Sequence, residues 1–362
     1  MPDSGPRTLD SRLAMVAWEV TRSCNLACIH CRASSLRGPY HGELGTARCL
    51  ELVDEIASVG KPVIILTGGE PLLREDIFEI AGRGTAKGLR MVLATNGTLV
   101  TEDVTRRMTD SGIKRVSISI DGADAVSHDE FRRVPGAFAG AMAGIEALKK
   151  AGMEFQINTT VTKTNLGQVR KILALAVGLG AAAYHIFLLV PTGRGREMAD
   201  QEISPEEYEK ILGWLYEQSS RCPIQLKATC APHYFRILHQ KGRGARNPEA
   251  NHPLHAMTRG CLGGSSFCFI SHTGQVQPCG YLEVDCGQIM KNRFNDIWMR
   301  SPVFKSLRDL NQYRGKCGRC EYIRVCGGCR ARAYEATGDY LEEEPLCVWE
   351  PRHRASGARR QP

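Results

Sequence analysis

The sequence predicts an α/β protein: a partial six-stranded (β/α)6 barrel followed by a smaller, cysteine-rich domain. Three observations predict this class. Strand-like and helix-like segments alternate from residue 14 to about residue 191, polar motifs follow the strands, and nine of the fifteen cysteines lie between Cys261 and Cys347. Alternating strands and helices are typical of parallel sheets with right-handed crossovers. Because the polar motifs fall where the strands end, we expect a TIM-like barrel rather than a doubly wound sheet.

Six apolar segments predict strands, and five periodic segments between them predict helices. The strands are expected at 14–21, 62–67, 90–95, 115–120, 154–161 and 184–190. The helices are expected at 47–59, 77–87, 102–111, 138–151 and 166–179. Ser204, followed by a proline and two acids, is a typical N-cap and predicts one more helix. The expected domains are an extension (1–13), the barrel (14–222), substrate loops with a cluster-bearing domain (223–350) and a basic, disordered tail (351–362).

The composition narrows the class of protein. The net charge is +8, but basic residues are scattered and aromatic residues make up only 7%, which argues against a nucleic-acid partner. The first fifteen residues contain four charged side chains and no apolar signal region, and no apolar run reaches membrane-spanning length. We therefore expect a cytoplasmic protein, in which clustered cysteines indicate metal or redox chemistry more often than disulfides.

Cys24, Cys28 and Cys31 form a C-x3-C-x2-C motif directly after the first expected strand. Cysteine thiolates are the ligands of iron–sulfur clusters, and three of them leave one iron of a 4Fe–4S cluster open to a further ligand. A zinc site is an alternative, although zinc usually takes two C-x2-C pairs and only Cys28 and Cys31 have that spacing. Three unrelated buried thiols are the remaining alternative.

Two further motifs stand in a fixed order behind this triplet. A Gly68-Gly69-Glu70-Pro71 turn follows the second strand, and a Ser119-Ile-Asp121-Gly122 segment ends the fourth, with His128-Asp129-x-x-Arg132 after it. Alone, each has an ordinary explanation as a turn or a solvated helix charge. In this order, the three motifs resemble those of the radical SAM superfamily.

The resemblance implies that the open iron binds the amino and carboxylate groups of S-adenosyl-L-methionine (SAM). Glu70 would then accept the ammonium group, Ser119 would meet the ribose or the carboxylate, and Arg132 would pair with a carboxylate. The implied SAM-binding residues are Gly68, Gly69, Glu70, Asn96, Ser119, Asp121, Arg132, Asn158 and Thr160. The region 190–193 after the sixth strand would complete the adenosine pocket.

The C-terminal cysteines follow a second pattern. Cys261 and Cys279 form C-x12-G-x4-C, residues 317–329 form C-x2-C-x5-C-x2-C, and Cys347 follows. This resembles the SPASM iron–sulfur domain, with one residue fewer than usual before Cys329. The two C-x2-C pairs are too close together for a zinc ribbon.

The SPASM resemblance implies one or two auxiliary 4Fe–4S clusters. The inner ligands would be Cys261, Cys268, Cys279 and Cys329, and the outer ligands Cys317, Cys320, Cys326 and Cys347. Cys286 is an alternative to Cys268 as a ligand of the inner cluster. Cys49, Cys222 and Cys230 are expected to be ordinary buried thiols, although Cys230 lies in a loop of interest.

The loops at 226–236, 255–264, 269–272 and 277–282 resemble the tetrapyrrole-modifying branch of the superfamily, which includes heme synthases, didecarboxysiroheme deacetylases and heme d1 enzymes. The heme synthase resemblance implies oxidative decarboxylation of two propionates of iron-coproporphyrin III to vinyl groups. It also implies cleavage of SAM to methionine and 5′-deoxyadenosine and a flavodoxin- or ferredoxin-type electron donor. Because arginine binds carboxylates bidentately, the expected substrate residues are mostly cationic, with two histidines as possible ligands of the heme iron: Arg194, Arg196, Lys227, His233, Arg236, His255 and Arg259.

Two other functions stay open. A SPASM peptide-modifying maturase usually carries a peptide-binding domain in front of the barrel, and here only about a dozen residues precede the first expected strand. A non-enzymatic cluster carrier would leave the Gly68–Glu70 motif without a role.

Overall fold

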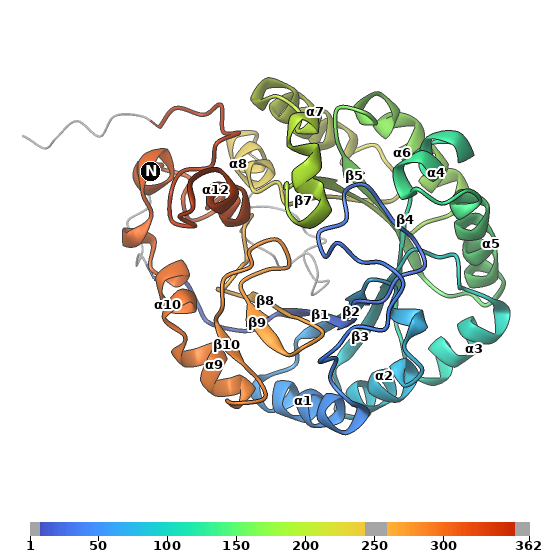
Figure 1. The fold of residues 1–362 in the computed structure, drawn as a ribbon. Coiled ribbons are helices and arrows are strands. Elements are labelled where there is room, and N and C mark those ends of the chain that lie inside the picture. Colours follow the sequence, from blue (N-terminus) through green and yellow to red (C-terminus); the bar gives the residue numbers. More distant parts are fainter. Residues whose placement is uncertain (1–7, 243–258, 352–362) are drawn as a thin grey trace, which may run out of the picture.

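The computed structural model describes residues 8–242 and 259–351, and in them a curved parallel sheet lies inside a ring of helices (Figure 1). The strands are β1 (Met15–Thr21), β2 (Val63–Gly68), β3 (Arg90–Thr95), β4 (Val116–Ser119), β5 (Phe155–Val161), β6 (Ala183–Leu188), β7 (Gln225–Thr229), β8 (Phe267–Ile270), β9 (Gln275–Gln277) and β10 (Gly287–Gln288). All six expected strands are present, with ends shifted by at most two residues.

The α-helices of the barrel region follow the expected pattern. They are α1 (Thr46–Val59), α2 (Ile77–Ala86), α3 (Glu102–Asp110), α4 (Ala125–Arg132), α5 (Ala137–Lys150), α6 (Val169–Leu179), α7 (Pro205–Gln218) and α8 (His233–Gln240). The later helices are α9 (Phe294–Arg300), α10 (Pro302–Arg308), α11 (Gly315–Arg319) and α12 (Arg330–Thr337). Short 3-10 turns are η1 (Pro71–Leu73), η2 (Leu166–Gln168), η3 (Gly193–Gln201) and η4 (Leu310–Gln312). The sequence did not predict α4 or α8, nor the later helices α9 to α12. Ser204 does cap α7, in a capping box with Glu207.

The strand order is β10-β9-β8-β1-β2-β3-β4-β5-β6-β7. Neighbouring strands from β8 through β1 to β7 all run parallel, whereas β9 and β10 are antiparallel. The expected partial barrel is therefore confirmed, and two strands extend it. β7 pairs with β6, and β8 pairs with β1, so the first C-terminal strand continues the barrel sheet.

The apolar core lies between the sheet and the outer helices. On β1, Val16, Trp18 and Val20 are fully buried in this layer together with Leu52 and Ile56 of α1. Because successive side chains of a strand point to opposite faces, the alternate residues of β1 face the interior of the barrel. The functional residues come from these inward positions and from the loops after the strands. In the described segments, no helix has the length and the apolar character needed to cross a membrane.

Candidate active site

The C-x3-C-x2-C triplet lies in the loop that follows β1. All fifteen cysteines fall within the described segments, and each is a free thiol. Cys24 and Cys28 are buried and Cys31 is half-buried. Each sulfur accepts one hydrogen bond: from the amide of Leu26 to Cys24 (3.4 Å), from the Arg132 guanidinium to Cys28 (3.5 Å) and from the amide of Ser35 to Cys31 (3.3 Å).

These donors favour the thiolate, which is the form that binds iron. Burial acts in the opposite direction and raises the pKa of Cys24 to about 12, with Glu70, Cys28 and Cys31 adding negative charge nearby. Binding of a cationic cluster would outweigh the effect of burial and favour the thiolate, because a metal deprotonates the thiol that coordinates it. Three clustered thiols with polar donors therefore fit a 4Fe–4S cluster held by three cysteines.

The Gly68-Gly69-Glu70 turn packs directly against the triplet loop. The amide of Gly69 donates to the Thr21 carbonyl (2.9 Å), and that of Glu70 donates to the Ser23 carbonyl (2.8 Å). A Cβ on Gly69 would lie 2.4 Å from the Ser23 oxygen. Glycine is therefore required because two backbone segments approach each other here.

Glu70 is fully buried at the start of this turn. Its carboxylate accepts hydrogen bonds from the Leu72 amide (3.1 Å), the Thr95 hydroxyl (2.7 Å) and the Asn96 amide (2.8 Å). Burial nevertheless raises its pKa to about 7. A nearby cation, such as the ammonium group of an amino acid, would stabilise the ionised form of this buried carboxyl.

Arg132, at the end of α4, joins the fourth-strand motif to the triplet. Its guanidinium forms a buried ion pair with the carboxylate of Asp121 and donates a hydrogen bond to the sulfur of Cys28. Asp121 also accepts the Thr160 amide (2.7 Å), and its own amide donates to Nδ1 of His128 (3.1 Å). Burial and Arg132 lower the pKa of His128 to about 4, so this histidine is neutral at pH 7.

Inward-facing polar side chains form a row across β4–β7. The strand register aligns Ser119 with Asn158, Asn158 with His185, and His185 with Lys227. Aligned residues of parallel strands share a face, and their neighbours Tyr184, Ile186 and Ala228 belong to the outer core. His185 was not among the residues predicted from the sequence, although the alternation of side chains along the sixth strand predicts that it faces inward.

Asn96 and Thr160, the two remaining expected SAM residues, lie at the same edge of the sheet. Asn96 donates through Nδ2 to Oδ1 of Asn25 in the triplet loop (2.8 Å). The region after β6 also contacts this loop: a Cβ on Gly193 would lie 2.1 Å from the Arg32 oxygen. Hydrogen bonds thus connect Gly69, Glu70, Asn96 and Arg132 to the triplet loop, whereas Ser119 and Asn158 lie on the strands beside it without a hydrogen bond to the triplet among the described residues.

The expected substrate residues are placed differently from one another. Arg194 donates to the carbonyls of Cys28 (2.9 Å) and Ser35 (3.0 Å) and so fixes the triplet loop. Arg196 forms an exposed ion pair with Glu335 (3.1 Å). Lys227 lies in the inward row, where burial lowers its pKa to about 8.

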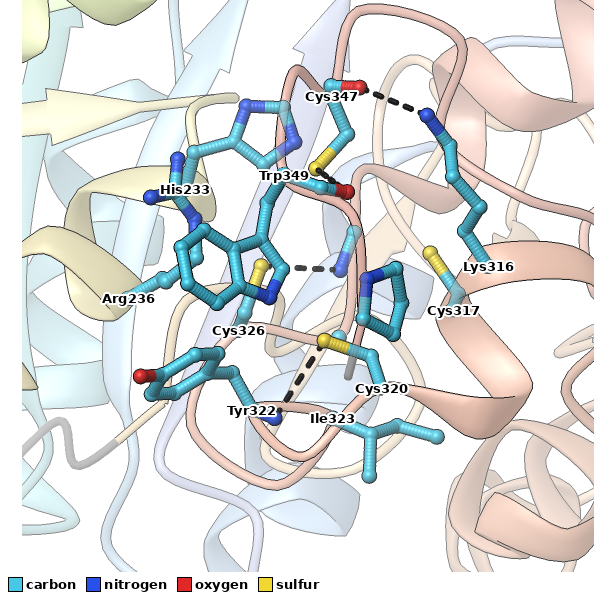
Figure 2. Close-up of a pocket in the computed structure, with 13 residues that line it drawn as sticks. His233, Arg236, Lys316, Cys317, Cys320, Tyr322, Ile323, Cys326, Cys347 and Trp349 are labelled. Carbon is cyan, nitrogen blue, oxygen red and sulfur yellow. Dashed lines mark hydrogen bonds between the residues drawn. The ribbon is translucent and has the colours of Figure 1, made fainter. Parts of the chain in front are cut away.

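The other substrate candidates lie near the C-terminal cysteines or outside the described residues. Arg259 donates to three carbonyls, those of Cys261 (3.0 Å), Ile323 (2.7 Å) and Arg324 (2.7 Å). His233 and Arg236, on α8, line the pocket of the outer cysteines instead of the barrel interior (Figure 2). Burial lowers the pKa of His233 to about 4. His255 falls outside the described residues.

The four outer cysteines surround one pocket. Figure 2 shows the sulfur atoms of Cys317, Cys320, Cys326 and Cys347 arranged around it, next to Trp349. Backbone amides donate to three of these sulfurs: Tyr322 to Cys320 (3.4 Å), Gly328 to Cys326 (3.5 Å) and Glu344 to Cys317 (3.5 Å). The Arg330 guanidinium also donates to Cys317 (3.4 Å). A pocket lined by four thiols and amide donors fits a 4Fe–4S cluster.

The inner cysteines gather around Cys329. Cys261 and Cys279 lie close enough to it for their charges to interact, and so does Cys230. The structure does not place Cys268 in this group. Cys268 is fully buried on β8, within charge-interaction distance of Cys286 and Arg308. The side chain of Cys268 instead belongs to the main apolar core, on the outer side of the sheet. Within residues 8–242 and 259–351, no three His, Cys, Asp or Glu side chains are arranged to hold a single metal ion.

Comparisons with known proteins agree with this geometry. Residues 18–176 match the radical SAM superfamily model, and residues 261–330 match the iron–sulfur cluster-binding domain model SPASM. The chain is 54% identical to the AdoMet-dependent heme synthase of Nitratidesulfovibrio vulgaris over 353 residues, 96% of each chain. It is 55% identical to that of Methanosarcina barkeri, over 93% of this chain and 97% of the relative. The chain belongs to the radical SAM heme synthase family.

Two more distant proteins also resemble this chain, one in sequence and one in fold. The Fe-coproporphyrin III synthase of Methanosarcina barkeri is 28% identical to this heme synthase family member, over 92% of this chain and 85% of the relative. The solved structure of SuiB from Streptococcus suis bound to its precursor peptide SuiA superposes with a TM-score of 0.74 at 14% identity, over 94% of this chain and 77% of that one. At that identity the superposition shows the shared fold alone. As a member of the family, the chain is a radical SAM enzyme with a SPASM iron–sulfur domain.

Proposed function

We propose that this enzyme converts two propionate side chains of iron-coproporphyrin III into vinyl groups and so produces heme b. The observation that carries the proposal is the identity of 54% and 55%, over nearly the full length, to two AdoMet-dependent heme synthases. The described site supports it, since it provides a three-cysteine loop, a buried carboxyl beside it and an inward polar row that ends in a lysine.

Cys24, Cys28 and Cys31 would hold the 4Fe–4S cluster that binds SAM. When bound, the cluster would supply the electron that cleaves SAM to methionine and a 5′-deoxyadenosyl radical able to remove a hydrogen atom from the β-carbon of a propionate. Loss of carbon dioxide and one electron from the substrate would then leave a vinyl group. The auxiliary cysteines would hold the acceptor of that electron, and two propionates consume two SAM molecules per heme.

The residues of the chain position these groups. Glu70 would accept the SAM ammonium group, which would favour its ionised form, and Ser119 and Asn158, paired on β4 and β5, would contact the rest of SAM. The Arg132–Asp121 ion pair keeps a positive charge next to Cys28. Lys227 is our preferred propionate partner. The charge of an incoming carboxylate would raise its lowered pKa and keep it protonated at pH 7.

Turnover with defined substrates tests the proposal. The full chain is reconstituted anaerobically with iron and sulfide and supplied with SAM, dithionite or reduced flavodoxin, and iron-coproporphyrin III. We expect the product mass to show loss of two carboxyl groups, with a matching yield of 5′-deoxyadenosine. Deacetylation of didecarboxysiroheme without turnover of coproporphyrin would refute the proposal and favour a sibling enzyme.

A variant separates radical generation from substrate binding. Replacing Cys24, Cys28 and Cys31 together by alanine should abolish 5′-deoxyadenosine formation. Porphyrin binding, measured by absorbance titration, should change little. Loss of both in a chain with a wild-type far-UV circular dichroism spectrum would contradict the assigned roles.

A further inference from the structure

We infer that Cys230 is the fourth cysteine of the inner auxiliary site, together with Cys261, Cys279 and Cys329. Cys268 has no part in that site. This inference rests on the proposed function only in taking the inner cysteines to hold an iron–sulfur cluster. It adds a ligand that lies outside the C-terminal cysteine motif, because Cys230 directly follows β7 of the barrel.

Packing places Cys230 with the inner cysteines. Cys230 and Cys279 are partly buried against one apolar cluster that contains Cys329, Val190 and Leu282. The thiol of Cys230 interacts electrostatically with three other cysteines, those at positions 329, 279 and 261. Four thiols from three distant segments of the chain thus lie near one another.

A single buried ion pair holds two of these cysteines in place. Arg332 donates to the Cys230 carbonyl (3.3 Å) and to a carboxylate oxygen of Glu344 (3.1 Å). The other carboxylate oxygen of Glu344 accepts the Cys329 amide (2.6 Å). The hydroxyl of Tyr208 donates to the Cys230 carbonyl as well (3.0 Å). All three of these side chains are buried, so the positions of Cys230 and Cys329 are fixed relative to each other.

The backbone of Cys230 is in an unusual conformation. Its φ is +55°, in the left-handed region that residues with a Cβ rarely adopt. Such strain persists only where the surroundings over-determine it, and it is concentrated at functional sites. Glycine would suit this backbone better, so the presence of cysteine here points to a requirement for the thiol.

Cys268 faces the other side of the sheet. Its neighbour Phe269 packs under the Arg32 guanidinium, 4.3 Å from the ring centre, on the inner side. Because successive side chains of a strand alternate, Cys268 points outward, where it lies near Cys286 and Arg308. Its thiol cannot reach the inner group without reversing the register of β8.

The fourth thiolate has a chemical consequence. The triplet after β1 leaves one iron open, whereas four cysteines occupy all four irons of a 4Fe–4S cluster. With Cys230 as a ligand, the inner cluster has no free iron for substrate. It is therefore suited to electron transfer and not to substrate binding.

Substitution at Cys230 can be designed so that folding is preserved. Cys230→Gly removes the thiol and relieves the left-handed backbone. Cys279→Ala serves as the reference for loss of the inner site, and Cys268→Ala as the matched control. Each full-length variant is reconstituted with iron and sulfide, its fold is checked by far-UV circular dichroism, and its iron content and dithionite-reduced electron paramagnetic resonance (EPR) spectrum are recorded.

We expect Cys230→Gly to lose or shift the same EPR component as Cys279→Ala, with up to about four iron atoms fewer per chain. Cys268→Ala should match the wild type in both measurements. A wild-type EPR spectrum in Cys230→Gly, or loss of the component in Cys268→Ala alone, overturns the inference. A wild-type spectrum in Cys279→Ala as well would show that the inner cysteines hold no cluster, which contradicts that part of the proposed function and not only the role of Cys230.

Discussion

Glu19 gives a prediction that can be worked out from the structure. It lies on the inner side of β1 with no exposed surface. Its carboxylate is 2.9 Å from Nη2 of Arg32, 2.7 Å from Nδ1 of His272 and 3.5 Å from Nε of Arg22. Burial raises its pKa, but Arg32, His272 and Arg22 outweigh burial and lower the pKa to about 2.

The expected effect of Glu19→Gln follows from this pKa. In the unfolded chain the pKa is near 4.5, so the ionised form is favoured in the fold by about 2.5 units, or about 3 kcal/mol at pH 7. A group with a lowered pKa stabilises the fold above its unfolded pKa and loses that contribution as the pH falls. Because glutamine resembles the protonated acid, the difference between variant and wild type should shrink to about 1 kcal/mol at pH 3.

Urea unfolding of the iron-free, full-length chain, followed by far-UV circular dichroism, measures this difference at both pH values. Glu51→Gln is the control, because Glu51 is exposed and forms only a weak 3.5 Å ion pair with Arg48. The free energy of unfolding of this variant should stay within about 0.5 kcal/mol of the wild-type value. A Glu19→Gln variant as stable as the wild type at pH 7 would refute the reasoning, and so would a difference that grows toward pH 3.

Three further predictions concern the triplet loop and a remote helix. Arg132→Met should destabilise the fold by about 3–5 kcal/mol in urea unfolding, because it leaves Asp121 buried without its partner; adding Asp121→Asn should recover part of the loss, and strict additivity would contradict this coupling. Gly69→Ala should weaken SAM binding by about tenfold or more in equilibrium dialysis, since its Cβ would lie 2.4 Å from the Ser23 oxygen; unchanged affinity would show that the turn can shift freely. Ser204→Ala should cost about 1 kcal/mol of stability and leave 5′-deoxyadenosine yield per folded chain unchanged; a reduced yield would tie α7 to the chemistry.

The barrel was predictable because its strands carry long apolar segments separated by periodic helices. β7 and β8 were not predicted. β7 has only five residues and places Lys227 between apolar neighbours, and β8 has four residues inside a cysteine-rich segment. Such short strands form because a neighbouring strand offers hydrogen bonds, and that information lies elsewhere in the chain.

The same reason explains the outcome for the cysteines. Spacing along the chain identifies ligands that come from one loop, and the triplet and the outer four are brought together as expected. Cys230 and Cys329 are about a hundred residues apart in sequence, and only the tertiary contacts through Arg332 and Glu344 place them together. Cys268 stood at a plausible spacing, but strand alternation, which its four-residue strand conceals, turns it outward.

The position of Tyr281 relates the two kinds of cysteine site to each other. Burial raises the pKa of its phenol, with further contributions from Cys230, Arg32, Cys279 and Cys31. Tyr281 packs in the same apolar cluster as Cys230, Cys279 and Cys329, and Cys31 of the triplet is near enough to affect the same phenol. If Cys230 completes the inner site, that cluster has no open iron to bind a propionate, and we expect the polar row across β4–β7 to orient it. Lys227 is the cationic member of that row.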